Sequence, residues 1–125
     1  MKTLISTPKA PAAIGPYSQG TRAGNLVFLS GQLGIDPATG ALATGGVAAQ
    51  AVQSLKNIQA LLKEVQASPE DIVKTTVFLT DMADFKAVNE AYAAVFSQNC
   101  PARSCIAVAQ LPLGGLVEIE AIVAL

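Results

Sequence analysis

Arg103 is the residue of this sequence best suited to bind a small anion. It follows Pro101, which stiffens the chain, and it directly precedes an apolar segment that we predict to be a strand. The planar guanidinium group makes two parallel, charge-assisted hydrogen bonds to a carboxylate. Arg103 therefore indicates a site for a carboxylate ligand. A solvated surface arginine, or an ion pair with Glu118 or Glu120, is the alternative interpretation.

Glu118 and Glu120 are two positions apart in an otherwise apolar segment near the C-terminus. Side chains two apart in a strand point to the same side of the sheet. A carboxyl group held in apolar surroundings has a raised pKa and can act as a general acid or base. The alternative is an outward-facing pair at a sheet edge, or an ion pair across an interface. The spacing does not choose between the two residues.

Other positions could line the same site. Cys105 lies two residues beyond Arg103 and is either a nucleophile or redox thiol, or a small packed side chain. Tyr17 lies in a loop framed by glycine and proline. It either orders a binding site or packs as a hydrophobic side chain against the sheet edge. Ser30 and Gly31 end an apolar strand. The glycine either lets a ligand approach the backbone closely or marks a plain bulge.

The composition limits the chemistry that these residues could perform. The chain has no histidine, which excludes Ser-His-Asp and Cys-His catalysis as well as histidine-ligated metal sites. Without a histidine to activate it, Cys105 is best interpreted as a packed residue. Cys100 and Cys105 are too few for a disulfide framework and indicate reduced thiols in a cytoplasmic protein. A net charge of −1 provides no field that would attract nucleic acid or a membrane surface.

A length of 125 residues fits one domain, which we assign to residues 1–125. Charged residues make up 14% of the chain, below the share of about 25% that is usual in soluble domains. Too few charges are available to cover a monomer. We therefore expect part of the apolar surface to be buried against another subunit.

Hydrophobic spacing predicts two helices, over residues 46–66 and 85–97. The first helix would carry one apolar stripe, formed by Ala48, Val52, Leu55, Ile58, Leu62 and Val65. The stripe of the second helix would be Phe85, Val88, Tyr92 and either Val95 or Phe96. A bend or bulge is expected at Gly31. Strands are predicted over residues 2–6, 26–30, 32–35, 72–79, 104–109 and 117–125.

The resulting order, β-β-β-α-β-α-β-β, predicts an α+β fold. Two helices are enough to cover only one face of a single mixed sheet. In the last strand, one side would carry Val117, Ile119, Ala121, Val123 and Leu125, and the other side both glutamates. A sheet with one helix-covered face and one mixed face is suited to packing against copies of itself.

The order of several short segments resembles one family, the reactive intermediate deaminases, also called the YjgF/YER057c/UK114 family. The combination of Pro-Ala-Arg-Ser with Glu-Ile-Glu is the most specific part of this resemblance, which extends over essentially the whole chain. The segments that match lie at residues 10–20, 29–32, 71–79, 88–92, 101–105 and 117–121.

The resemblance implies a chorismate-mutase-like fold and a homotrimer, in which the sheets face inward as a barrel. It implies ligand clefts between subunits and the hydrolysis of 2-aminoacrylate, 2-iminopropanoate or 2-iminobutanoate to 2-keto acids and ammonia, with no cofactor or metal. By resemblance, Arg103 would bind the substrate carboxylate and Glu118 would position or activate water. The cleft would also contain Tyr17, Ser30, Gly31, Asn89 and the backbone of Cys105.

Two other functions compete with this interpretation. The first is a non-catalytic trimer that binds a small carboxylate or docks on a partner enzyme. The second is the endoribonuclease or translation-inhibitor activity ascribed to some relatives. The net charge of −1, without a basic stripe, argues against the second.

Overall fold

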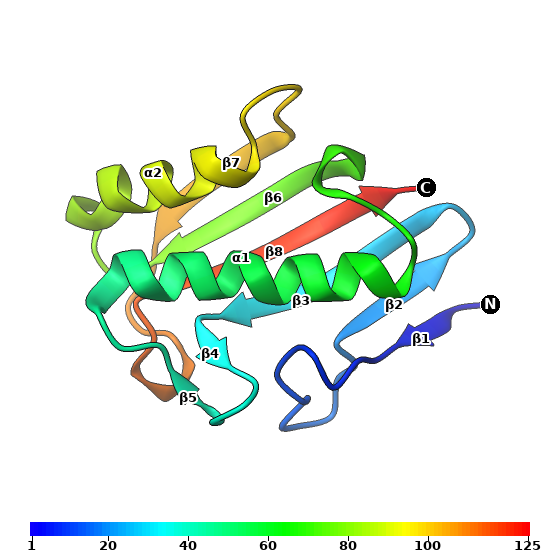
Figure 1. The fold of residues 1–125 in the computed structure, drawn as a ribbon, viewed down its shortest axis with the longest axis horizontal. Coiled ribbons are helices and arrows are strands. Elements are labelled where there is room, and N and C mark those ends of the chain that lie inside the picture. The colour runs from blue at the N-terminus through cyan, green and yellow to red at the C-terminus, as the bar shows by residue number, and fades with distance from the viewer.

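A computed structural model describes residues 1–125, and its centre is a six-stranded sheet covered on one face by two helices (Figure 1). The strand order is β1-β2-β3-β8-β6-β7, with β6 and β7 parallel and the other neighbours antiparallel. These strands are β1 (Thr3–Ile5), β2 (Gly20–Ala23), β3 (Leu26–Leu33), β6 (Ile72–Leu79), β7 (Ala102–Ala107) and β8 (Val117–Ala124). The helices are α1 (Gly46–Glu64) and α2 (Phe85–Val95). This arrangement confirms the α+β fold expected from the sequence.

Short elements complete the chain and frame the ends of the sheet. A separate hairpin and three 3-10 turns are present: β4 (Ile35–Asp36), β5 (Ala41–Leu42), η1 (Pro69–Asp71), η2 (Met82–Asp84) and η3 (Pro112–Gly114). No helix of the structure has both the length and the apolar character required to cross a membrane.

The core lies between the sheet and the helices. On β8, the residues expected on one side, Val117, Ile119, Ala121 and Val123, are all buried. On α2, Val88 and Tyr92 are buried, as the spacing predicted. The alternation along β8 therefore places Glu118 and Glu120 on the face that the helices leave open.

The predicted apolar stripe of α1 is wrong in its first half. Ala48 and Val52 are exposed, whereas polar Gln50, Ser54 and Asn57 are buried. These polar side chains are buried because they pair with backbone groups of the sheet and its connections. Ser54 Oγ donates to the carbonyl of Gln32 at 2.7 Å, and Asn57 Nδ2 donates to the carbonyls of Leu33 and Ile35 at 3.1 and 2.9 Å. Gln50 Oε1 accepts a hydrogen bond from the amide of Leu116 at 2.9 Å.

Several predicted strand boundaries also need correction. β2 was not predicted; it forms a hairpin with β3 around Gly24, whose φ is +63°. The two strands expected on either side of Gly31 are one strand, β3, whose register against β8 shifts between Leu29 and Gln32. Strand β7 begins at Ala102, so Arg103 lies inside a strand rather than before it.

The open face of the sheet is mixed in character, as expected. Phe28 on β3 and Ile106 on β7 are 42% and 49% exposed there, although both lie in regular strands. Lys74 Nζ donates to Ser104 Oγ at 2.9 Å on the same face. Apolar side chains exposed in this way on a regular sheet favour burial against another protein surface.

Candidate active site

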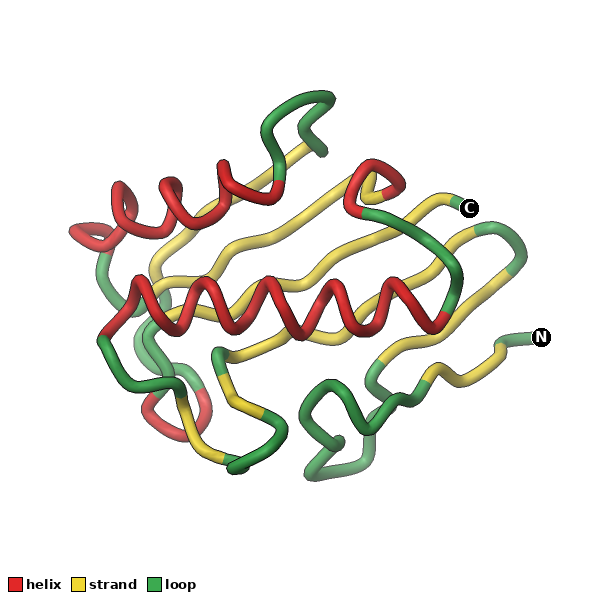
Figure 2. The backbone as a smooth tube through the Cα atoms, viewed as in Figure 1, coloured by secondary structure: helices red, strands yellow, loops and turns green.

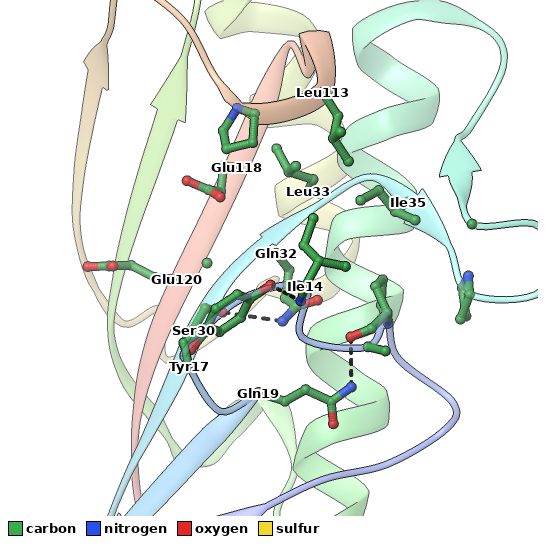
Figure 3. A pocket seen from close by; sticks show the side chains of 16 residues that line it. Ile14, Tyr17, Gln19, Ser30, Gln32, Leu33, Ile35, Leu113, Glu118 and Glu120 are labelled. Atoms are coloured by element: carbon green, nitrogen blue, oxygen red, sulfur yellow. Dashed lines mark hydrogen bonds between the residues drawn. The ribbon is translucent and has the colours of Figure 1, made fainter.

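A cavity of about 680 Å³ lies beside the open face of the sheet, at the end where β3 and β8 approach η3 (Figure 3). This volume lies within the range typical of small-molecule sites. The cavity brings together five of the residues singled out from the sequence. These are Tyr17, Ser30, Gly31, Glu118 and Glu120.

The loop that carries Tyr17 is held in place by the buried side chain of Gln19. Figure 2 shows the long loop between β1 and β2 that carries Tyr17. Gln19 is 5% exposed, accepts a hydrogen bond from the Thr7 amide at 2.7 Å, and donates to the carbonyls of Thr7, Ala10 and Pro11 at 3.1, 3.2 and 2.7 Å. Gln19 could not be recognised from the sequence, since no periodicity marks a residue whose hydrogen bonds fix a loop.

Ser30 fixes the same loop to the sheet. Its hydroxyl donates to the carbonyl of Ser18 at 2.6 Å, and its amide donates to the carbonyl of Gln19 at 3.0 Å. Tyr17 itself is 50% exposed, and its hydroxyl accepts a hydrogen bond from the amide of Ile14 at 3.4 Å. The tyrosine is therefore ordered but remains accessible from the cavity.

Gly31 is required by the side chain of Glu118. A Cβ added at Gly31 would lie 2.8 Å from Cδ and 3.1 Å from Oε1 of Glu118. The sequence left open whether Gly31 admits a ligand or marks a bulge. The structure shows the bulge, as a register shift between Leu29 and Gln32, and places the Glu118 carboxyl group against Gly31. Burial raises the pKa of Glu118, and the neighbouring charge of Glu120 raises that pKa further. Glu118, the less exposed of the two glutamates, is therefore the carboxyl group suited to proton transfer.

Arg103 lies on the other face of the sheet, beneath α2. Its register partner on β6 is Thr75, which is fully buried on the helix-covered face. One guanidinium nitrogen donates to Asn89 Oδ1 at 2.7 Å, and the group lies 4.8 Å from the ring centre of Tyr92 and 5.5 Å from that of Phe85. Within one chain Arg103 makes no ion pair with Glu118 or Glu120, because the two glutamates lie on the opposite face of the sheet.

This aromatic and amide setting fixes the guanidinium group. The Tyr92 hydroxyl shares a hydrogen bond of 2.8 Å with Thr75 Oγ1, which orients the ring against Arg103. Burial raises the pKa of Tyr92 despite the opposing effects of Thr75 and Arg103. An arginine with one donor engaged and its plane supported by aromatic rings retains further donors for a carboxylate.

Cys105 lies on the same side of β7 as Arg103, since its register partner is buried Val77. Burial raises the pKa of the Cys105 thiol, against the lowering effect of Arg103. A raised pKa keeps the thiol protonated at neutral pH, which opposes a role as a nucleophile. Cys100 and Cys105 are both free, and no group of histidine, cysteine, aspartate or glutamate side chains is arranged to hold a metal ion.

The candidate residues therefore form two groups within one chain. The first group, around the cavity, contains Glu118 and Tyr17. The second, on the helix-covered face of the edge strand β7, contains Arg103, Asn89 and Cys105, none of which lines the cavity. A single chain does not bring the guanidinium group of Arg103 to the carboxyl group of Glu118.

Comparisons with known proteins show which family has this architecture. The model of the family described as endoribonuclease L-PSP matches residues 7–125. The chain belongs to the endoribonuclease L-PSP family. Its similarity to relatives named as deaminases confirms the resemblance inferred from the short motifs.

Three relatives illustrate how closely the family is shared. The mouse protein named 2-iminobutanoate/2-iminopropanoate deaminase is 50% identical over 122 residues, which are 98% of this chain and 90% of the mouse protein. The crystal structure of RidA from an Antarctic Psychrobacter is similar with a TM-score of 0.95 and 48% identity, covering 98% of this chain and 99% of that one. The crystal structure of Escherichia coli TdcF with bound serine is similar with a TM-score of 0.93 and 44% identity, covering 98% of both chains.

Proposed function

We propose that this protein hydrolyses 2-imino acids and their enamine tautomers, among them 2-aminoacrylate, 2-iminopropanoate and 2-iminobutanoate, to 2-keto acids and ammonia. The observation that carries this proposal is a pair of groups on the sheet. One is Arg103, which is held in place by Asn89 and keeps hydrogen-bond donors free for a carboxylate. The other is Glu118, whose carboxyl group has a raised pKa and lies in the cavity. The name of the mouse relative supports the reaction. The serine bound to the E. coli relative supports the ligand class, since serine carries a carboxylate beside a carbon that bears nitrogen.

The proposed chemistry needs one orienting group and one proton carrier. Arg103 would bind the substrate carboxylate, and Asn89 would hold the guanidinium in place. Glu118 would accept a proton from a water molecule whose oxygen adds to C2 of the imine, and would deliver a proton to the nitrogen. The product of this step is a carbinolamine at C2. Glu118 would then take the proton of the new hydroxyl group and pass it to the amine, so that the carbon–nitrogen bond breaks, ammonia leaves, and the carbonyl of the keto acid forms. A raised pKa suits Glu118 to both steps, because a carboxylate whose pKa lies above its usual value is a stronger base and, once protonated, can still give up that proton.

The remaining residues would shape the site around this reaction. Tyr17, Ser30 and Gly31 would line the cleft on the Glu118 side, and the backbone of Cys105 would help to hold the water or the nitrogen on the Arg103 side. An imine is prone to hydrolysis, so orientation and one proton shuttle provide a useful acceleration. The proposed mechanism requires no metal or cofactor.

We infer that the working protein is a homotrimer with the open sheet faces turned inward as a barrel, residues 1–125 acting as one domain of each subunit. The separation of Arg103 from Glu118 supports this assembly, since a cyclic interface joins two different patches of the same chain. Exposed Phe28 and Ile106 on the open face, and the low charged fraction of 14%, support it as well. We place the activity in the cytoplasm, where two free thiols remain reduced.

The competing functions make different predictions. A trimer that only binds carboxylates would retain the Arg103 group without accelerating hydrolysis. An endoribonuclease activity, which the family is named for, would require affinity for the phosphates of RNA. A chain with a net charge of −1 and no histidine is poorly suited to bind or cleave RNA.

The decisive experiment couples purified protein to a serine/threonine dehydratase and follows the release of keto acid. Arg103→Ala should lower kcat/KM about a hundredfold, because two charge-assisted hydrogen bonds to the carboxylate are lost. Arg103→Lys should recover only part of this loss, since an ammonium group cannot form the bidentate pair. Arg22→Ala is the matched control, because Arg22 is exposed and bonds only to the carbonyl of Gly24 at 2.9 Å. A wild-type protein that releases keto acid no faster than buffer would contradict the proposed function.

A further inference from the structure

Leu113 occupies a backbone conformation that leucine rarely adopts. It lies within η3 with φ 60° and ψ 18°, in the left-handed region that favours glycine or asparagine. Its side chain is nevertheless 61% exposed and lines the cavity beside Glu118. A branched side chain in this conformation, exposed to solvent, indicates a function for the side chain rather than a need of the fold.

The surrounding turn fixes where Leu113 points. The amide of Gly115 donates to the carbonyl of Pro112 at 3.0 Å, and the amide of Leu116 donates to Gln50 Oε1 on α1 at 2.9 Å. A Cβ at Gly115 would lie 2.7 Å from Cδ2 of Leu33, so the turn is packed directly on the wall of the cavity. Leu113 is therefore presented by a rigid framework.

Leu113 is part of an apolar wall of the cavity, formed by Ile14, Leu33, Ile35 and Leu113. Figure 3 shows the Leu113 side chain extending from η3 toward Leu33 and Ile35. Ile14, which is 72% exposed, reaches the same cavity from the Tyr17 loop. Two exposed aliphatic side chains from separate elements thus border one cavity.

The groups that a 2-imino acid carries indicate which of them the apolar wall would contact. A 2-imino acid has three groups on C2: the carboxylate, the nitrogen and the side chain. In the proposed function the carboxylate binds Arg103 and the nitrogen receives a proton from Glu118. The side chain is the group that is left to meet the apolar wall.

We propose that Leu113 is a specificity-determining residue that contacts the substrate side chain, so that the protein favours 2-imino acids with branched aliphatic side chains over 2-iminopropanoate. This inference rests on the proposed function and deepens it. The left-handed backbone at Leu113 projects the side chain over the cavity. Each additional methylene group that a substrate places against the apolar wall strengthens binding, because more apolar surface is removed from water.

The test compares two imines, generated by an amino acid oxidase from leucine and from alanine. The measured quantity is the ratio of kcat/KM for the leucine-derived imine to that for the alanine-derived imine. Leu113→Asn keeps a residue that tolerates the left-handed backbone and removes the apolar contact. This variant should lower the ratio about tenfold, the effect of losing one or two methylene contacts, while kcat/KM for the alanine-derived imine changes little. Leu113→Met should keep most of the wild-type ratio.

Leu4→Asn is the matched control, since Leu4 is 63% exposed and lies away from the cavity. Size-exclusion chromatography of each variant separates a substrate contact from a subunit contact. The inference is overturned if Leu113→Asn leaves the ratio unchanged, lowers kcat/KM equally for both imines, or dissociates the assembly. If the wild-type protein hydrolyses neither imine, the proposed function fails and the inference fails with it. If it hydrolyses the alanine-derived imine and the ratio does not respond, the inference alone is wrong.

Discussion

Replacing Gly31 by alanine should impair catalysis by displacing a carboxyl group that the substitution does not alter. The new Cβ would lie 2.8 Å from Cδ, 3.0 Å from Cγ and 3.1 Å from Oε1 of Glu118. An ordinary contact starts at 3.4 Å, so the carboxyl group must move by about 0.6 Å or more. The backbone of β8 cannot follow, because Glu118 is paired with Phe78 on one side and Leu33 on the other.

The size of the effect follows from this displacement. A misplacement of about 1 Å in a catalytic site costs about a hundredfold in rate, so Gly31→Ala should lower kcat between about tenfold and a hundredfold. This corresponds to about 1.4–2.7 kcal/mol of lost transition-state stabilisation. KM should change less, since Arg103 is untouched. The free energy of unfolding should fall by only about 1 kcal/mol, because the crowded group is the end of a flexible side chain.

The assay is steady-state keto-acid release with Gly31→Ala, Glu118→Gln and the double variant. If the alanine acts through Glu118, it should cost little in the Glu118→Gln background, where the proton carrier is already lost. Gly15→Ala is the control, because a Cβ there would meet the Tyr17 ring at an ordinary 3.7 Å. Losses that add fully in the double variant would show that the methyl group acts on the substrate directly. A wild-type kcat in folded Gly31→Ala would refute the importance of the Glu118 position.

Three further predictions follow from the same structure. Because the pKa of Glu118 is raised on folding, the folded chain binds more protons than the unfolded chain above the ordinary glutamate pKa, so stability falls as pH rises through the folded pKa. Calorimetry should therefore find that the Tm advantage of Glu118→Gln over wild type grows as the pH rises above about 4, the ordinary glutamate pKa, and a constant difference would contradict the raised pKa. Gly34→Ala should destabilise the fold by about 3 kcal/mol in chemical denaturation, since its Cβ would clash with the carbonyl oxygen of Gln50 and neither backbone can yield. Wild-type stability of this variant would disprove the contact. Iodoacetamide should alkylate exposed Cys100 before Cys105, whose thiol pKa is raised by burial, and peptide mass spectrometry showing the reverse order would contradict the protonated thiol.

Hydrophobic spacing predicted the parts of this fold that are held by apolar packing. The alternation along β8 and the stripe of α2 end in a core of Val, Ile and Tyr side chains, and both were found where the sequence placed them. The first half of α1 could not be predicted in this way. Its inward residues Gln50, Ser54 and Asn57 are buried by hydrogen bonds to segments 22 to 66 positions away in the chain. Hydrophobic periodicity carries no information about such partners.

The missed hairpin had a local signal of its own. Gly24-Asn25 connects β2 to β3, and a two-residue turn of these types is typical of a tight hairpin. β2 itself, Gly20–Ala23, has too few apolar residues to be recognised, and it forms because β3 pairs with it. Strand pairing, rather than propensity, determines this element.

The site was predictable in its residue types and not in its geometry. The planar guanidinium group of Arg103 indicated carboxylate binding, and the position of Glu118 in an apolar strand indicated proton transfer. The sequence did not indicate that the two groups face opposite sides of the sheet, since that depends on the parallel register of β6 and β7. Nor did the sequence indicate that the rings of Tyr92 and Phe85 support Arg103. Aromatic residues at helical spacing are equally typical of a helix face that packs in the core.

Subunit complementation tests the central claim, a site shared between Arg103 of one copy and Glu118 of another. Arg103→Ala and Glu118→Gln chains are each purified alone and also coexpressed in equal amounts. Each variant alone should be nearly inactive in keto-acid release. In randomly mixed trimers about a quarter of the interfaces should join an intact Arg103 to an intact Glu118, so coexpression should restore about a quarter of the wild-type activity. Mixed trimers that remain as inactive as the separate variants would contradict a site built between subunits.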